Sequence, residues 1–121
     1  MRRAKKEDGS EYRIGIEDPR ATETGYAAAA ILELSDCYVS TSSDAENFFI
    51  SEGKRYCHIL DPRTGRPVET DVAGVTVICE KSIDAEGFST TLLALGLERG
   101  LALARRHPEI LQAFFIAPDG T

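Results

Sequence analysis

A run of apolar, β-branched residues at 72–79 constrains the fold more than any other feature of the sequence. The run reads VAGVTVIC and contains no charged side chain. A strand with one face in water alternates apolar and polar residues, whereas a nearly continuous apolar strand is covered on both faces. Residues 72–79 therefore predict a strand in the centre of a sheet.

Shorter strands are expected on both sides of this run, at residues 12–17, 27–34, 37–41 and 113–117. The segment 27–34 is rich in alanine and could be helical, but it is short and β-forming residues follow it directly. Residues 42–45 are expected to form a turn. Residues 48–50 and 55–60 flank Glu52-Gly53 and predict a hairpin, and the DPRTGRP segment at 61–67 predicts a tight loop.

After the central strand, the hydrophobic period changes from that of strands to that of helices. Residues 82–95 predict a helix with Ser82 as its N-cap and Gly96 as its stop, and residues 98–107 predict a second helix that Pro108 ends. The first helix is expected to bury a stripe of Ile83, Phe88, Leu92 and Leu95. The whole chain, 1–121, then reads as one α+β domain: a largely antiparallel sheet with two helices packed on one face.

Composition excludes several classes of function. The net charge is −6 over 121 residues, and the one basic run, at residues 2–6, is followed at once by Glu7 and Asp8. A nucleic-acid partner is therefore not expected, because such a partner needs a clustered basic surface. No stretch has the apolar length of a membrane span, and no signal-peptide pattern opens the chain. The compartment stays open, with the cytoplasm as one possibility.

The three cysteines, Cys37, Cys57 and Cys79, cannot all pair with one another within the chain. They are far apart, have no CxxC spacing and fall in predicted strands, so buried free thiols are expected rather than a zinc site.

The first segment with chemical potential is YCHILDPRTGRPV, residues 56–68. A strand delivers His58 near its end, and the turn that follows lets Asp61 accept hydrogen bonds from backbone N–H groups while Gly65 adopts a positive φ. A histidine beside such a turn can transfer a proton next to a phosphate. The structural alternative is a strand histidine satisfied by its neighbours and followed by an ordinary turn.

The second segment is DAEGFSTTLLALG, residues 84–96. Glu86 and Thr90 are four residues apart and share one face of a helix, so they can offer two oxygens to one hard cation such as Mg²⁺. The structural alternative is a solvated first turn with Thr90 half-buried.

Together, TSSDAENFFISEGKRYCHILDPRTGRPV, VTVIC and AEGFSTTLLALG resemble the ApbE family in order, spacing and composition. The histidine loop of that family is matched at six positions: His58, Asp61, Pro62, Thr64, Gly65 and Pro67. Its helix is matched at Ala85, Ser89, Thr90 and Gly96. The segment YRIGIEDPR is also similar to the family, so the resemblance covers nearly the whole chain.

The resemblance implies part of a T-fold-like domain and a Mg²⁺-dependent enzyme that transfers FMN from FAD to a threonine of an acceptor protein. His58 would be the catalytic base, and Glu86 and Thr90 the metal ligands. Asp61 would shape the loop, with Arg63 and Thr64 near FAD. The family is often exported or membrane-anchored.

The chain departs from the family in ways that leave its activity open. Glu86 stands where aspartate is usual, Ser43 replaces a glycine, and Ala45 stands where an aromatic residue is common. The glycine-rich, lysine-containing FAD-binding segment and a backbone metal ligand, which precede this region in the family, are not found here. We therefore expect the C-terminal half of the enzyme, inactive without an N-terminal half or partner chain.

Two further interpretations remain open at the level of the sequence. The chain could be an inactive flavin-binding or scaffold module of the same fold. It could also be an acceptor of FMN itself, although Ser89-Thr90-Thr91 only superficially resembles an acceptor site.

Overall fold

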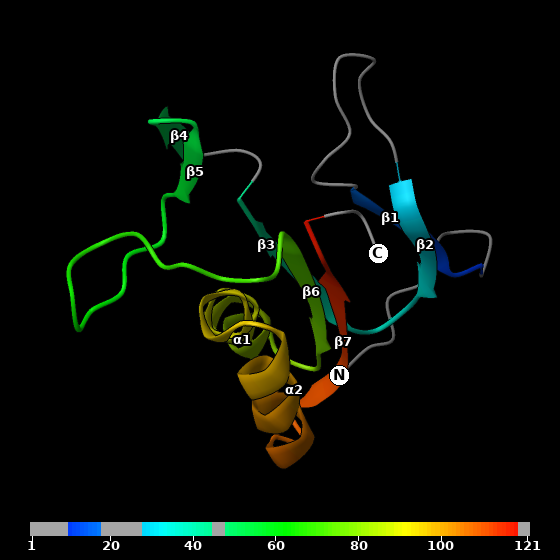
Figure 1. The fold of residues 1–121 in the computed structure, drawn as a ribbon. Coiled ribbons are helices and arrows are strands. Elements are labelled where there is room, and N and C mark those ends of the chain that lie inside the picture. Colours follow the sequence, from blue (N-terminus) through cyan, green and yellow to red (C-terminus); the bar gives the residue numbers. More distant parts are fainter. Residues whose placement is uncertain (1–9, 18–27, 45–47, 119–121) are drawn as a thin grey trace.

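The structure, a computed structural model, describes residues 10–17, 28–44 and 48–118. Seven strands and two helices follow one another in these segments (Figure 1). They are β1 (Tyr12–Glu17), β2 (Ala28–Leu34), β3 (Tyr38–Ser43), β4 (Phe48–Ser51), β5 (Lys54–Cys57), β6 (Gly74–Cys79), α1 (Ser82–Leu95), α2 (Leu97–Arg106) and β7 (Ile110–Ile116).

The centre of the molecule is a three-stranded antiparallel sheet with the order β3-β6-β7. β6 lies between its two partners, as the apolar run predicts, and all six of its residues are buried. Val75, Val77 and Cys79 lie on one face of the strand, and Thr76 and Ile78 on the other. Both faces of this strand are therefore covered, which explains why it carries no charged residue.

The two helices and the central sheet enclose the main hydrophobic core, and Figure 1 shows both helices on the same side of β6 and β7. α1 packs on β3 and β6, and α2 packs on α1 and β7. The fully buried side chains of α1, Ala85, Ser89, Leu92 and Leu93, follow a helical period and face the sheet. The arrangement leaves one polar residue, Ser89, inside an otherwise apolar stripe.

A sharp break at Gly96 separates the two helices. Its backbone has φ 84° and ψ −179°, a conformation that residues with a Cβ rarely adopt, and its N–H donates to the carbonyl of Leu92. α2 begins at the next residue, where the N–H of Leu97 donates to Oδ1 of Asp71 at 2.9 Å. Asp71 thus caps α2 from the loop that leads into β6, and ties that loop to the helix junction.

The α+β class with antiparallel strands and two helices is confirmed, and the strands divide among three sheets rather than one. The β1–β2 and β4–β5 pairs form two-stranded antiparallel sheets of their own. In Figure 1 these two small sheets lie on opposite sides of the central sheet.

Strand boundaries differ from the expectation at several places. The central strand begins at Gly74 rather than at residue 72, and the last strand is Ile110–Ile116 rather than 113–117, because it pairs with β6 from Ile110 onward. The turn expected at 42–45 is wrong for Ser42 and Ser43, which continue β3 because they pair with Val75 and Gly74 of β6. The strand expected at 55–60 ends at Cys57, because the chain turns there and Leu60 instead forms a single bridge with Pro67. Of the other two positions of the expected turn, Asp44 forms a bend after β3 and Ala45 lies outside the described residues.

Two expectations for α1 are also wrong. Ser82 is the first helical residue rather than the N-cap; Lys81 occupies the cap position, without a side-chain cap bond. Ile83 is 78% exposed and is not part of the buried stripe. It lies two residues before Ala85, which at about 100° per residue turns its side chain to the opposite side of the helix.

The described cysteines are free thiols. Cys79 is buried in β6, and Cys37 is half-buried just before β3 rather than within a strand. Burial raises the pKa of both thiols, so they stay protonated at neutral pH. The side chain of Cys57 lies outside the described set. None of the helices in the described segments is long and apolar enough to cross a membrane.

Candidate functional site

The histidine-containing segment forms a closed, hydrogen-bonded loop between β5 and β6. The N–H of Asp61 donates to the carbonyl of Arg66 at 2.8 Å, and the N–H groups of Thr64 and Gly65 donate to the carbonyl of Asp61 at 3.2 and 2.8 Å. Gly65 has φ 70°, which allows the chain to reverse, as the sequence predicts. At the base of the loop, the N–H of Val68 donates to the carbonyl of Ile59 at 2.9 Å.

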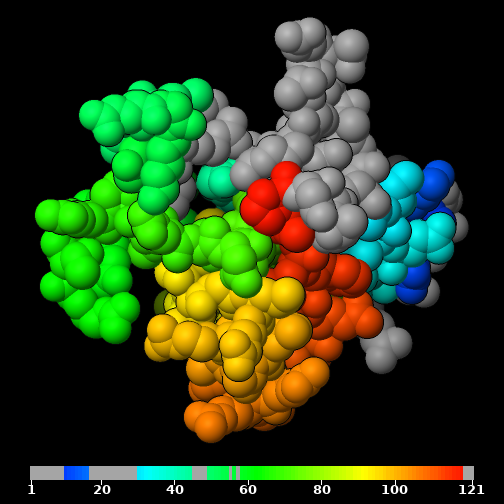
Figure 2. All heavy atoms as spheres, in the orientation of Figure 1, coloured from blue at the N-terminus to red at the C-terminus, as the bar shows by residue number. Residues whose placement is uncertain are grey.

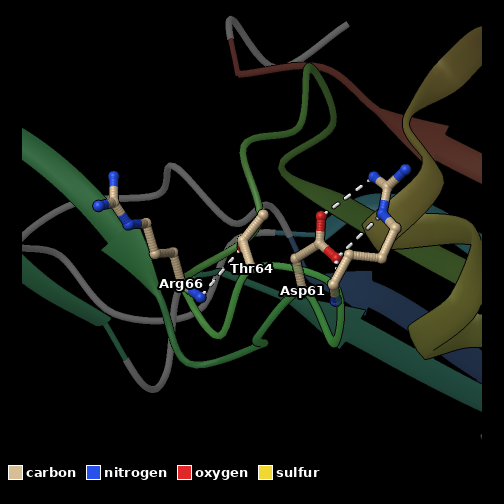
Figure 3. A network of polar contacts seen from close by, with 4 residues as sticks. Asp61, Thr64 and Arg66 are labelled. Atoms are coloured by element: carbon tan, nitrogen blue, oxygen red, sulfur yellow. Dashed lines mark hydrogen bonds and ion pairs between the residues drawn. The ribbon is translucent and has the colours of Figure 1, made fainter.

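Asp61 organises the loop through its side chain as well. Oδ1 accepts the backbone N–H of Arg63 at 2.9 Å, and the guanidinium of Arg63 reaches both carboxylate oxygens, at 3.3 and 3.1 Å (Figure 3). The side-chain and backbone hydrogen bonds from Arg63 hold the pKa of Asp61 below its usual range, helped by the charges of Arg63 and Arg99. The carboxylate is therefore fixed and ionised at neutral pH.

Thr64 and Arg66 complete the loop. Oγ1 of Thr64 accepts the N–H of Arg66 at 3.2 Å, and Figure 3 shows the side chains of Asp61 and Arg66 pointing to opposite sides of the loop. The three residues expected in the cofactor site, Asp61, Arg63 and Thr64, thus lie together in one loop that is joined by hydrogen bonds within it.

His58 follows the last residue of β5 and is exposed. The next residue, Ile59, packs against the main hydrophobic core. The β4–β5 hairpin and the 58–67 loop project from the same side of the molecule (Figure 2). An ion pair between Lys54 of β5 and Glu69 links the hairpin to the chain just beyond the loop. The histidine therefore sits at the surface, between two anchored segments.

The second expected pair, Glu86 and Thr90, lies in a cluster of hydroxyl groups between β3 and α1. Ser40 Oγ donates to Glu86 Oε1 at 3.1 Å, and Ser42 Oγ lies 3.1 Å from Thr90 Oγ1. Ser89 joins the two halves, with its Oγ 3.2 Å from Ser40 Oγ and 2.9 Å from Ser42 Oγ. The structure thus brings Glu86 and Thr90 together on one face of the helix.

The donors of this cluster suit a hard cation. They are one carboxylate and several hydroxyl oxygens, and Mg²⁺ takes only one or two carboxylates from a protein, with water and phosphate oxygens completing its shell. Within the described part of the chain, no group of three or more His, Cys, Asp or Glu side chains could hold a metal by itself. Glu86 and Thr90 therefore fit Mg²⁺ as a partial ligand set.

The two groups of candidate residues remain separate in their bonding. In the described segments, the hydrogen bonds and ion pairs of Asp61, Arg63 and Thr64 stay within their loop, and those of Glu86 and Thr90 stay between β3 and α1. Sequence reasoning did not identify Ser40 and Ser42 as members of the second group. The sequence did carry a sign of this group. Ser40 and Ser42 are two residues apart on a strand and therefore face the same way, and Ser89 is a polar residue on the buried face of α1.

Comparisons of the sequence and of the structure with known proteins point to the same family. The ApbE family model matches residues 1–115. An FAD:protein FMN transferase of Treponema pallidum is 42% identical over 109 residues, which is 90% of this chain and 29% of that protein. The crystal structure of the flavinyl transferase ApbE of Pseudomonas stutzeri is similar with a TM-score of 0.74 and 47% identity, covering 97% of this chain and 34% of that one.

A further crystal structure, of an ApbE protein from Thermotoga maritima, superposes with a TM-score of 0.77 at 32% identity. It covers 93% of this chain and 35% of the other. The chain thus spans about a third of the length of the relatives it matches, or slightly less.

Proposed function

This chain belongs to the ApbE family, and from that premise we propose that residues 1–121 are the C-terminal portion of an enzyme that transfers FMN from FAD to a threonine of a target protein, with Mg²⁺. The observation that supports this most is the cluster between β3 and α1, where Glu86 and Thr90 each contact a serine hydroxyl of β3 and are joined through Ser89. Transfer by the complete enzyme needs the remainder of its length as well.

The reaction is a phosphoryl transfer in which the chain's residues would bind, orient and move one proton. The threonine oxygen attacks the FMN phosphorus of FAD, an O–P bond forms, the bond to the bridging oxygen breaks, and AMP leaves. We assign the threonine proton to His58, which is exposed and follows β5 directly. Mg²⁺ held by Glu86 and Thr90 would neutralise charge on the pyrophosphate.

Arg63 and Thr64 are proposed to lie beside FAD. A guanidinium has five N–H donors, and the ion pair with Asp61 uses two of them. The side chain of Arg63 is 77% exposed, so its remaining donors can reach a phosphate oxygen without breaking that pair. Asp61 would act indirectly, by holding the loop and Arg63 in place.

The test is a titration of the chain with FAD, with and without Mg²⁺, followed by flavin fluorescence. We expect Mg²⁺ to tighten binding in the wild type and Glu86→Gln to remove that dependence. In an enzyme completed with the remaining family segments, His58→Ala should keep FAD binding and lower AMP release with a threonine acceptor by about 10²- to 10⁴-fold. Thr64→Ala, which leaves the Asp61 carboxylate untouched, should weaken FAD binding without removing its Mg²⁺ dependence, because Thr64 is proposed to lie beside FAD and not beside the metal.

A folded chain that ignores FAD at all Mg²⁺ concentrations would contradict the proposal that a usable half-site is present. The alternative function is an inactive flavin-binding or scaffold module of the same fold, which Glu86 and Ser43 favour because both depart from the family pattern. Retention of Mg²⁺-dependent FAD binding without any AMP release from the completed enzyme would support that alternative.

A further inference from the structure

β3 presents two different hydroxyl systems on its two faces. Ser40 and Ser42 point to α1 and contact Glu86, Ser89 and Thr90. Thr41, between them, points the other way and lies 2.8 Å from Thr76 Oγ1 of β6. Because side chains alternate along β3, one face of the strand carries the cluster that contacts the proposed metal ligands. The other face carries a hydroxyl pair that does not contact them.

Two of the bonds in the cluster have a fixed direction, because a carboxylate and a main-chain carbonyl can only accept. The carboxylate of Glu86 can only accept, so Ser40 donates to it, and Ser89 donates to the main-chain carbonyl of Glu86 at 3.2 Å. In the contacts of Ser89 with Ser40 and Ser42, and of Ser42 with Thr90, either hydroxyl can be the donor. Where Thr90 donates to Ser42, the lone pairs of Thr90 remain available to a cation.

Ser40 is the residue that restrains the Glu86 side chain. Ser40 is buried, with 8% exposure, and its partner Ser89 is fully buried, whereas Glu86 is exposed on the helix surface. An exposed glutamate has three rotatable side-chain torsions, and ordering it costs conformational entropy. A hydrogen bond from a buried hydroxyl on the sheet holds Oε1 and leaves Oε2 for a cation.

We propose that Ser40 is a positioning residue for Glu86, which lets a glutamate serve where the family usually has aspartate. The inference rests on the proposed function, because it takes Glu86 as a metal ligand. The side chain of an aspartate at position 86 would be shorter than that of glutamate by one C–C bond, about 1.5 Å. Its carboxylate would then lie too far from Ser40 Oγ to keep the present 3.1 Å hydrogen bond. Ser40 and Glu86 therefore act as a pair.

The test measures Mg²⁺ affinity by competition with Mn²⁺, followed by electron paramagnetic resonance on the full chain. Ser40→Ala should weaken Mg²⁺ binding on the order of tenfold, as is typical when a partner that orients a metal ligand is removed. Ser40→Thr, which keeps the hydroxyl, should restore the affinity to within about threefold. In the Glu86→Asp background, Ser40→Ala should have no further effect, because the hydrogen bond is already absent.

Thr41→Val is the matched control, since it removes a hydroxyl contact from the same strand on the face away from Glu86. It should leave Mg²⁺ affinity unchanged, and thermal unfolding of each variant confirms that it is folded. Mg²⁺ binding that depends on Glu86 but is the same in Ser40→Ala would overturn the inference and leave the proposed function standing. A wild type that binds neither ion would overturn the metal assignment, and the role of Ser40 with it.

Discussion

At the scale of single residues, Asp61 shows how one side chain determines the shape of a loop. Its carboxylate accepts the backbone N–H of Arg63 and the guanidinium of the same residue, while its carbonyl accepts the N–H groups of Thr64 and Gly65. The bonded form of the side chain is the ionised one. Protonation of Asp61 therefore competes directly with the structure of the loop.

This coupling predicts a pH dependence. The pKa of Asp61 is lowered in the folded chain, so its stabilising contribution is present above the ordinary aspartate pKa and is lost as the pH falls through the lower, folded value. We expect the carboxyl ¹³C resonance of Asp61 to titrate below the usual aspartate range. In Arg63→Ala it should move most of the way back, because the side chain of Arg63 is the largest cause.

Thr64→Ala serves as the control, because Thr64 bonds the N–H of Arg66 and not the carboxylate. Its Asp61 resonance should titrate as in the wild type. An Asp61 that titrates in the ordinary range in the wild type would show that the ion pair does not persist in solution.

At the scale of elements, the two helices use glycine for different reasons. Gly100 of α2 is buried against β7, and a Cβ added there would lie 2.9 Å from Cε1 of Phe115 and 3.3 Å from the carbonyl oxygen of Leu92. Gly87 of α1 is exposed, and a Cβ there would meet nothing within 4 Å. The close approach of α2 to the sheet therefore depends on Gly100, whereas the packing of α1 does not depend on Gly87.

Alanine substitutions should separate these cases. Gly87→Ala should raise the free energy of unfolding by about 0.5–1 kcal/mol, because alanine is the better helix former. Gly100→Ala gains the same propensity but overpacks the contact with Phe115, which costs about 1–3 kcal/mol, so a net loss of stability is expected. Chemical denaturation of both variants measures the difference. Equal stabilisation by the two substitutions would mean that α2 can move away from β7 without cost.

At the scale of the whole molecule, the buried central sheet contrasts with the projecting β4–β5 hairpin. β6 is hydrogen-bonded on both edges and buried on both faces, while β4 and β5 pair only with each other. The hairpin is held by its own stacked pair, Phe49 and Tyr56, with ring centroids 5.0 Å apart, and by the exposed ion pair of Lys54 with Glu69. Exposed ion pairs contribute little to stability, so the hairpin should open more readily than the core.

Amide hydrogen exchange tests this hierarchy. Exchange should be slowest in β6 and clearly faster in β4 and β5. Val77→Ala, which removes two methyl groups from the core, should cost about 2 kcal/mol and speed exchange across β3, β6, β7 and α1 by about 30-fold. Phe49→Ala should speed exchange in the hairpin alone. Equal protection of β5 and β6 in the wild type would contradict this description.

Much of the fold follows from local patterns in the chain. The apolar run before residue 80 placed the central strand, the helical period after Ser82 placed α1, and Gly96 ended it with a positive φ. The bonds of the 61–67 loop were also predictable, because an aspartate, a proline and a glycine at that spacing turn the chain through contacts between near neighbours. These features depend on residues within about one helical turn of each other.

Contacts between distant residues were decided by the tertiary structure alone. Ser42 and Ser43 look like turn residues, but pairing with β6 makes them the end of β3. Ser40 is 46 residues from Glu86 and Ser42 is 48 residues from Thr90, so no local pattern reports that they meet. The sequence by itself determined the elements and the chemical types at the candidate site. Only the packing of α1 on β3 decided which oxygens come together, because that depends on which face of each element the core has to bury.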